Sequence, residues 1–413
     1  MKTLLALTMI AGTCAAATPK ATVNAVTVDA SAAKVTVSYA LSDAAAIVTA
    51  KFFTNGVAVA EGDATSLFGD VNKLVAVGDT RSFAWYVRHD IPDFPACDVS
   101  VELSLWSEAN PPDYMAVSLQ APSNVLYYAS TNALPGGIGS DRWRTGELLM
   151  RRIRAKGATF PMGKNTPDAK RIKEHAVTLT NDFYIGVFEL TQSQLYNISG
   201  KNAYYRDGKW EWTQSNKFTN LTCNATRPAD NLLWRTLKGT KDGMATAAGG
   251  IIGKLNAKTG LPFDLPTEAQ WEFACRAGTE TQRFDSDLNR VSRNKDNGGM
   301  NGGALWPYDV AADKATARVG SYAPNAYGLY DMYGNVNEIC LDRYEALTDG
   351  KAVTEPLITS GGQHVARGGN AASTDLKWLT SAMRMGPFIE SMDNPGGGDL
   401  YGARLAIRIR AAE

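Results

Sequence analysis

The chain carries no net charge, because its 413 residues contain 42 Lys and Arg and 42 Asp and Glu. Without a basic surplus, the composition gives no attraction to nucleic acid or to an anionic membrane. The sequence also lacks a long hydrophobic run, since the apolar stretch LLALTMIAG near the N terminus is too short to span a bilayer. We therefore expect no nucleic-acid partner and no transmembrane segment.

Cysteine and histidine are scarce, with five and three residues, and they form no recognised catalytic motif. The absence of Cys-x-x-Cys argues against a zinc-thiolate site or a thioredoxin-like pair. No His-Glu-x-x-His, Gly-x-Ser-x-Gly or Walker sequence occurs either. His175 and His364 are isolated, so we interpret them as core or surface histidines rather than ligands.

The N terminus has the features of a secretory signal. Lys2 precedes the apolar run, and the small residues TCAAATPK follow it. We predict a signal peptide over residues 1–17, cleaved after Ala17, and an exported protein that is periplasmic, displayed on the cell surface or secreted. A lipoprotein modified at Cys14 is the alternative. Export would permit disulfides, but the sequence leaves open any pairing among Cys97, Cys223, Cys275 and Cys340.

After the signal-like segment, the residue pattern of the sequence changes twice along the chain. Residues 18–122 alternate apolar and polar positions in about seven short segments, which predicts an all-β sandwich of immunoglobulin or fibronectin III type. Residues 123–147 include Pro-Gly-Gly and predict a linker. Residues 148–413 combine short strands, long Gly- and Asn-rich loops and few helices, so we expect an α+β domain there. Its clearest helix begins in LPTEAQWEFACRAG, where Thr267 and Gln270 form a capping box, and a second is expected over residues 190–199.

One segment of this domain has the chemistry of a cation site. In NAYGLYDMYGNVNEICLD, the carboxylates of Asp331 and Glu338 flank the main-chain carbonyls of Gly334 and Val336. Hard cations such as calcium need several oxygens that converge from a bent backbone. The alternative is a polar Ω-loop held by its own hydrogen bonds.

Five blocks of the sequence resemble the formylglycine-generating enzyme family, also called the sulfatase-modifying factor domain. In chain order they are RRIRAKGATFPMGK, FYIGVFELTQSQLYNISG, LPTEAQWEFACRAG, VGSYAPNAYGLYDMYGNVNE, and VARGGN followed by YGARLAIRI. The resemblance covers about residues 148–411, and its third and fourth blocks are the specific ones. It implies a C-type-lectin-like α+β fold with little regular secondary structure and bound calcium.

The resemblance also assigns the calcium ligands by position. The first ion would be held by Asp331, the carbonyls of Gly334 and Val336, and Glu338. The counterparts of the second set are Asn297 and Asp313, although the spacing between them differs from the family pattern. Calcium is therefore the expected cofactor.

The activity that the resemblance implies is the oxidation of a cysteine in a sulfatase to formylglycine. The family uses two cysteines that bind copper, and they follow the Arg-Gly-Gly motif. Here that window reads NAASTDLKWLTSAMR, and Cys340 is the last cysteine of the chain. The catalytic pair is absent, so copper is not expected. Ser381 replaces the family cysteine that pairs with the one in the signature helix, which leaves Cys275 free or paired with Cys223 or Cys340.

We expect a non-catalytic binding or structural relative whose groove, beside the window, takes an unidentified protein or carbohydrate ligand. One alternative is an enzyme of the family, an oxidoreductase acting on proteins, that uses other residues. Another is a variable ligand-display protein of retroelement type. Oligomeric state is left open. The predicted groove residues are Arg367, Asn370, Asp375, Lys377, Trp378 and Arg384.

Overall fold

A computed structural model describes residues 17–94, 97–164, 173–200, 204–206, 209–211, 225–230, 232–240, 243–297, 316–345, 350–373, 375–385 and 400–409. The chain divides into two compact units between Pro111 and Pro112. The predicted signal peptide (apart from Ala17), Cys14, Cys223 and Asp313 lie outside the described residues. In the described part, no helix is long and apolar enough to cross a membrane.

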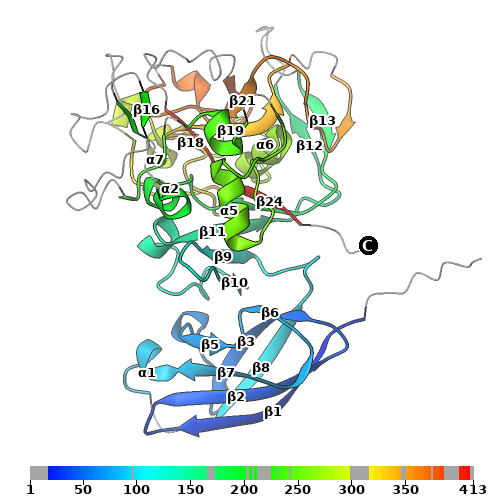
Figure 1. The fold of residues 1–413 in the computed structure, drawn as a ribbon, viewed down its shortest axis with the longest axis vertical. Helices are drawn as coiled ribbons and strands as arrows, with labels where there is room; N and C mark the ends of the chain where they lie inside the picture. Colours follow the sequence, from blue (N-terminus) through cyan, green and yellow to red (C-terminus); the bar gives the residue numbers. More distant parts are fainter. Residues whose placement is uncertain are drawn as a thin grey trace, which may run out of the picture. The chain divides into compact units, whose positions relative to one another are not determined.

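The first unit is β-rich and consists of two sheets around one core (Figure 1). One sheet has the order β1-β2-β7-β5, and in the other β3 pairs with β4, β6 and β8. Alternate residues of β2 are buried, as expected for a strand with one face on a core. The bounds are β1 Lys20–Asp29, β2 Lys34–Ser42, β3 Ala46–Thr54, β4 Val57–Ala58, β5 Leu67–Gly69, β6 Lys73–Val75, β7 Gly78–Tyr86, α1 Val87–Asp90 and β8 Val99–Trp106. This confirms a β-rich N-terminal region, and its immunoglobulin or fibronectin type stays a prediction.

The second unit is also mostly strand, with a few short helices. Its larger sheets have the orders β10-β9-β11-β14-β24 and β22-β21-β19-β23. The strands of these sheets are β9 Tyr114–Ser118, β10 Val125–Tyr128, β11 Glu147–Ile153, β14 Phe183–Gly186, β19 Asn337–Arg343, β21 His364–Arg367, β22 Arg384–Met385, β23 Tyr401–Gly402 and β24 Ala406–Arg408. Smaller pairings use β12 Thr159–Met162, β13 His175–Thr178, β15 Tyr204–Arg206, β16 Lys209–Glu211, β17 Ser292–Arg293, β18 Tyr333–Gly334 and β20 Val353–Thr354.

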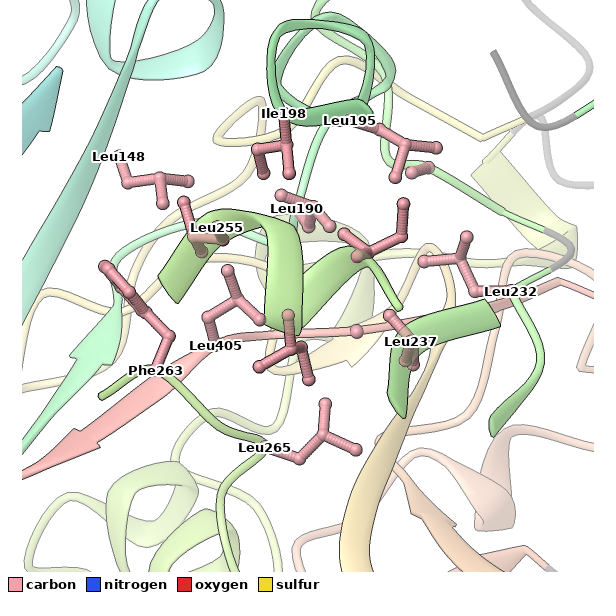
Figure 2. Packing of buried hydrophobic residues seen from close by; sticks show 14 of the residues in the cluster. Leu148, Leu190, Leu195, Ile198, Leu232, Leu237, Leu255, Phe263, Leu265 and Leu405 are labelled. Carbon is pink, nitrogen blue, oxygen red and sulfur yellow. The ribbon is translucent and has the colours of Figure 1, made fainter. Parts of the chain in front are cut away.

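The helices of this unit cover its sheets and close two apolar cores. They are α2 Gln192–Ser199, α4 Trp234–Lys238, α5 Ile251–Thr259, α6 Glu268–Arg276 and α7 Leu288–Val291. Figure 2 shows one core, where side chains such as Leu195, Leu255 and Leu405 from different elements interdigitate. The other core contains Trp271 of α6 and Leu329, Met332 and Tyr333 of the segment that follows Asn325.

The structure differs from the expected linker over residues 123–147. Strand β10 lies inside this range and pairs with β9, which in turn pairs with β11. Trp143, in the short 3-10 helix Asp141–Arg144, is fully buried. Residues 112–147 therefore belong to the fold of the second unit, because β9 supplies a strand that the larger sheet needs. The Pro-Gly-Gly turn interrupts regular structure without separating two domains.

Both predicted helices are confirmed, and so is the predicted capping box of α6. Thr267 accepts from the backbone N–H of Gln270, whose side chain accepts from the Thr267 N–H. Thr191 and Gln194 form the same reciprocal pair at the start of α2. Such boxes satisfy backbone donors that a helix end would otherwise leave unpaired. The box at Thr267 fixes the residue at which α6 begins. It therefore also fixes the positions of the acidic residues Glu268 and Glu272 in the first two turns.

Candidate functional site

The segment from Asn325 to Glu338 is anchored to the end of α6. The Asn325 side-chain amide donates to the carbonyls of Ala274 and Cys275 at 2.8 and 3.1 Å. Its oxygen accepts from the backbone of Tyr327 and Leu329. One asparagine thus satisfies carbonyls at a helix end and folds the loop that follows.

A turn at Gly334 and Asn335 gives the loop its bend. Gly334 has φ +81°, and a Cβ there would lie 2.1 Å from the carbonyl oxygen of Arg293, so only glycine fits. Asn335 also has positive φ, and its backbone N–H donates to the same carbonyl. The Ω-loop alternative stays a prediction: Asn325 forms hydrogen bonds within the segment, whereas Gly334 and Asn335 bond to other parts of the chain.

Asp331 presents one carboxylate oxygen that is satisfied and one that is not. Its Oδ2 accepts from the Gly320 N–H at 2.6 Å, whereas its Oδ1 is buried without a hydrogen-bond partner. Burial raises the pKa of Asp331 to about 6, although the Gly320 hydrogen bond acts in the opposite direction. A buried carboxylate oxygen of this kind calls for a proton or a cation.

Glu338, the other predicted acidic ligand, is instead the partner of a buried arginine. Its carboxylate accepts three contacts from Arg404, the shortest 2.6 Å, and one from the indole N–H of Trp271 at 2.6 Å. Arg404 also donates to main-chain carbonyls of β14 and the residue after it. In this arrangement Glu338 contributes charge to the loop, but its oxygens are already engaged.

Glu189 is a third carboxylate at this site, and the sequence predictions missed it. It is fully buried and accepts from the Asn335 side-chain amide at 2.6 Å and from the Val336 N–H at 3.1 Å. Burial, followed by the charges of Asp331 and Glu338, raises the pKa of Glu189 well above its ordinary value. A glutamate inside the apolar stretch IGVFEL was the available signal.

The fit of this loop to calcium rests on its charge and on Asp331. Three carboxylates at no more than 2% exposure share one guanidinium, that of Arg404, so ionising all three would leave excess negative charge. The unpartnered Oδ1 of Asp331 supplies a hard oxygen. In the described chain, however, no three His, Cys, Asp or Glu side chains converge as a ready metal site. Asn297, predicted for a second ion, is engaged in a local turn with Ser292 and Asn294.

The window that follows Arg-Gly-Gly is held by ion pairs at its two arginines. Arg367 is fully buried and pairs with Glu272 and Glu268, while Arg384 donates to both carboxylate oxygens of Glu268 at 2.6 and 2.9 Å. Burial alone would lower the pKa of Arg367, but Glu272 and Glu268 raise it above its ordinary value. The structure therefore places both predicted groove arginines inside the protein, where they join the window to α6.

The other predicted groove residues lie nearer the surface. Asp375 caps the 3-10 helix Leu376–Trp378 and pairs with the exposed Lys377 at 2.6 Å. Trp378 is half-buried, and Asn370 folds back on its own loop by accepting from the Ala372 N–H. Asp375, Lys377 and Trp378 thus share one short surface element, apart from the buried contacts of the two arginines.

The thiols of this domain that the structure describes are inert. Cys275 and Cys340 form no disulfide and are fully buried, and burial raises the pKa of each well above the ordinary value. A thiolate, rather than a thiol, binds copper and reacts. The Ser381 hydroxyl donates to the Gln282 carbonyl at 3.1 Å, in the place of a disulfide partner. These residues do not fit a copper site.

Comparison with known proteins agrees with the resemblance read from the motifs. The family model described as Sulfatase-modifying factor enzyme 1-like domain matches residues 145–409. A formylglycine-generating enzyme of Thermomonospora curvata is 38% identical over 84 residues, which are 20% of this chain and 28% of that enzyme. The match thus spans little more than a quarter of the enzyme's length.

Longer matches are found with relatives of other names. Chaperone protein LppX of Paenibacillus barcinonensis is 29% identical over 205 residues, 46% of this chain and 70% of that protein. Inactive C-alpha-formylglycine-generating enzyme 2 of Bos taurus is 24% identical over 255 residues, 56% and 81% of the two chains. Among solved structures, Treponema denticola variable protein 1 has a TM-score of 0.46 at 23% identity and covers 63% of this chain and 95% of that one.

Proposed function

The chain belongs to the sulfatase-modifying factor family, and on that premise we propose that it is an exported, non-catalytic binding protein. Its family domain would be stabilised by calcium, and its ligand would be a protein or a carbohydrate. The surface element Asp375–Trp378, in which Lys377 is exposed, would form part of the ligand-facing surface. Export is supported by the signal-like N terminus of the sequence.

The state of the thiols is the observation that carries the proposal. The window from Arg367 to Arg384 contains no cysteine, and Cys275 and Cys340 are buried and neutral. Formylglycine formation by the family's route needs two thiolates at a copper ion, because soft sulfur selects Cu(I). The relatives named as inactive or as a chaperone support the idea that this scaffold also serves without oxidation.

Calcium is proposed from the loop's surplus of buried carboxylates. Asp331 would supply its unpartnered oxygen, and the carbonyls of Gly334 and Val336 would be the further ligands. Glu338 would lend negative charge while it keeps its contacts with Arg404 and Trp271. A bound calcium ion would neutralise this excess charge and hold the bend of the loop.

The decisive experiment offers the purified full chain a Cys-x-Pro-x-Arg peptide with oxygen, Cu(I) and a reductant. We expect no aldehyde by mass spectrometry or aldehyde-specific labelling, while an active formylglycine-generating enzyme converts the same peptide. Conversion by this chain at a rate that depends on copper would overturn the proposal. Calcium titration of the same preparation by calorimetry tests the metal separately from the chemistry.

A further inference from the structure

The loop of residues 331–338 is held in place by Glu189, which lies far from it in the sequence. Glu189 sits between strand β14 and helix α2, and both of its carboxylate oxygens reach the loop. One accepts from the Asn335 side chain and the other from the Val336 backbone. These two contacts fall directly after the positive-φ turn at Gly334, so Glu189 fixes the conformation with which the loop leaves that turn.

Asn335 connects Glu189 to a third segment of the chain, at Ala317. Its side-chain oxygen accepts from the Ala317 N–H at 2.8 Å, while its amide donates to Glu189. Asn335 and Glu189 are fully buried, so no water replaces a lost contact without rearrangement. A carboxylate suits this position because it accepts twice and donates nothing.

When Glu189 is ionised, its own contacts do not neutralise its charge. Its hydrogen-bond partners are an amide and a backbone N–H, both neutral groups. The nearest guanidinium, Arg404, is paired with Glu338, and Arg144 acts on Asp331 while it donates to carbonyls of residues 138–140 and 319. A divalent cation at Asp331 would complete the charge balance of the cluster.

We infer that Glu189 is a positioning residue for the cation site: it holds the loop in its binding conformation and supplies part of the negative charge that makes the loop select a divalent cation. It does this without being a ligand itself. This inference rests on the calcium part of the proposed function. Side chains that hold and polarise metal ligands in this way typically change affinity by about 10- to 100-fold when they are altered.

Calorimetric calcium titration of the full chain, with thermal unfolding in calcium and in chelator, tests this role. Glu189→Gln removes the charge and one acceptor while keeping the size of the side chain. We expect its calcium affinity to fall about tenfold or more and its calcium-induced rise in melting temperature to shrink. Glu147→Gln is the matched control, because Glu147 is a part-buried glutamate of the same unit that pairs with Arg142 at 2.6 Å. Its calcium affinity should equal that of the wild type.

Each other outcome overturns the inference in a distinguishable way. If Glu189 is merely structural, Glu189→Gln will lower the melting temperature equally with and without calcium and leave the affinity unchanged. If the wild type binds no calcium, the calcium proposal itself fails and the inference fails with it. Should Glu189→Gln not fold, Glu189→Asp decides, since it keeps the charge but is too short to reach both donors. An unchanged affinity in Glu189→Asp would overturn the positioning role.

Discussion

Two buried ionic clusters in the same domain differ in their charge balance. Around α6, the buried carboxylates of Glu268 and Glu272 pair with three guanidiniums, those of Arg276, Arg367 and Arg384. At the 331–338 loop, the carboxylates of Asp331 and Glu338 share Arg404 with that of Glu189. Both clusters are almost completely shielded from water, so charge is costly in each unless it is compensated.

This difference in charge balance distinguishes a self-compensated structural network from a cluster that needs an added proton or cation. The α6 cluster is compensated by its own arginines and joins the helix to the window at Arg367 and Arg384. The loop cluster meets its surplus by binding protons, as the raised pKa values of Glu189 and Asp331 indicate, or by binding a cation. Position in the fold, rather than residue type, therefore decides which buried carboxylates arginine compensates.

Replacing a buried arginine by methionine should have the largest effect on stability. It also tests the difference between the two clusters most directly. Arg367→Met and Arg404→Met each leave buried carboxylates uncompensated, so each should cost about 3 to 5 kcal/mol of unfolding free energy. Calcium should restore part of the loss in Arg404→Met, because the ion adds positive charge to that cluster, and none of it in Arg367→Met. Urea denaturation of both variants, in calcium and in chelator, measures this. Equal responses to calcium would show that the two clusters are alike.

How much of this could be predicted from sequence depends on the range of the interactions. The capping box at Thr267 could be predicted because its partner Gln270 lies three residues along the chain. Glu189 acts on residues almost 150 positions away, and the pairing of Glu338 with Arg404 spans 66. Local patterns do not report such contacts, and this is why Glu338 was predicted as a ligand and Glu189 was overlooked.

The pH dependence of the unfolding free energy tests the same difference between the two clusters, with a smaller expected effect. The folded-state pKa of Asp331 is raised to about 6, above its unfolded value near 4, so its protonated form stabilises the fold. This stability is fully present below about pH 4 and is lost as the pH rises through about 6, which amounts to roughly 2 to 3 kcal/mol. Without calcium, the difference between wild type and Asp331→Asn should change across that window in urea melts at pH 4, 5, 6 and 7. Saturating calcium should abolish this change, since the bound ion favours the ionised carboxylate, and a difference that stays flat in chelator would contradict the assignment.

The exposed ion pair of the window should contribute least to stability. Lys377 and Asp375 pair at 2.6 Å with side chains 64% and 43% exposed, so solvent screens the attraction between them strongly. Lys377→Met should therefore leave the urea midpoint almost unchanged, in contrast to Arg367→Met at the other end of the same window. Asp375→Asn tests the cap of the 3-10 helix separately, because the asparagine oxygen can still accept from the Lys377 N–H. A loss of several kcal/mol in Lys377→Met would mean that this element is part of the buried scaffold. A small loss would mean that the side chains of this element can change without destabilising the fold. This is what we expect of a ligand-facing surface that is attached to the buried α6 network.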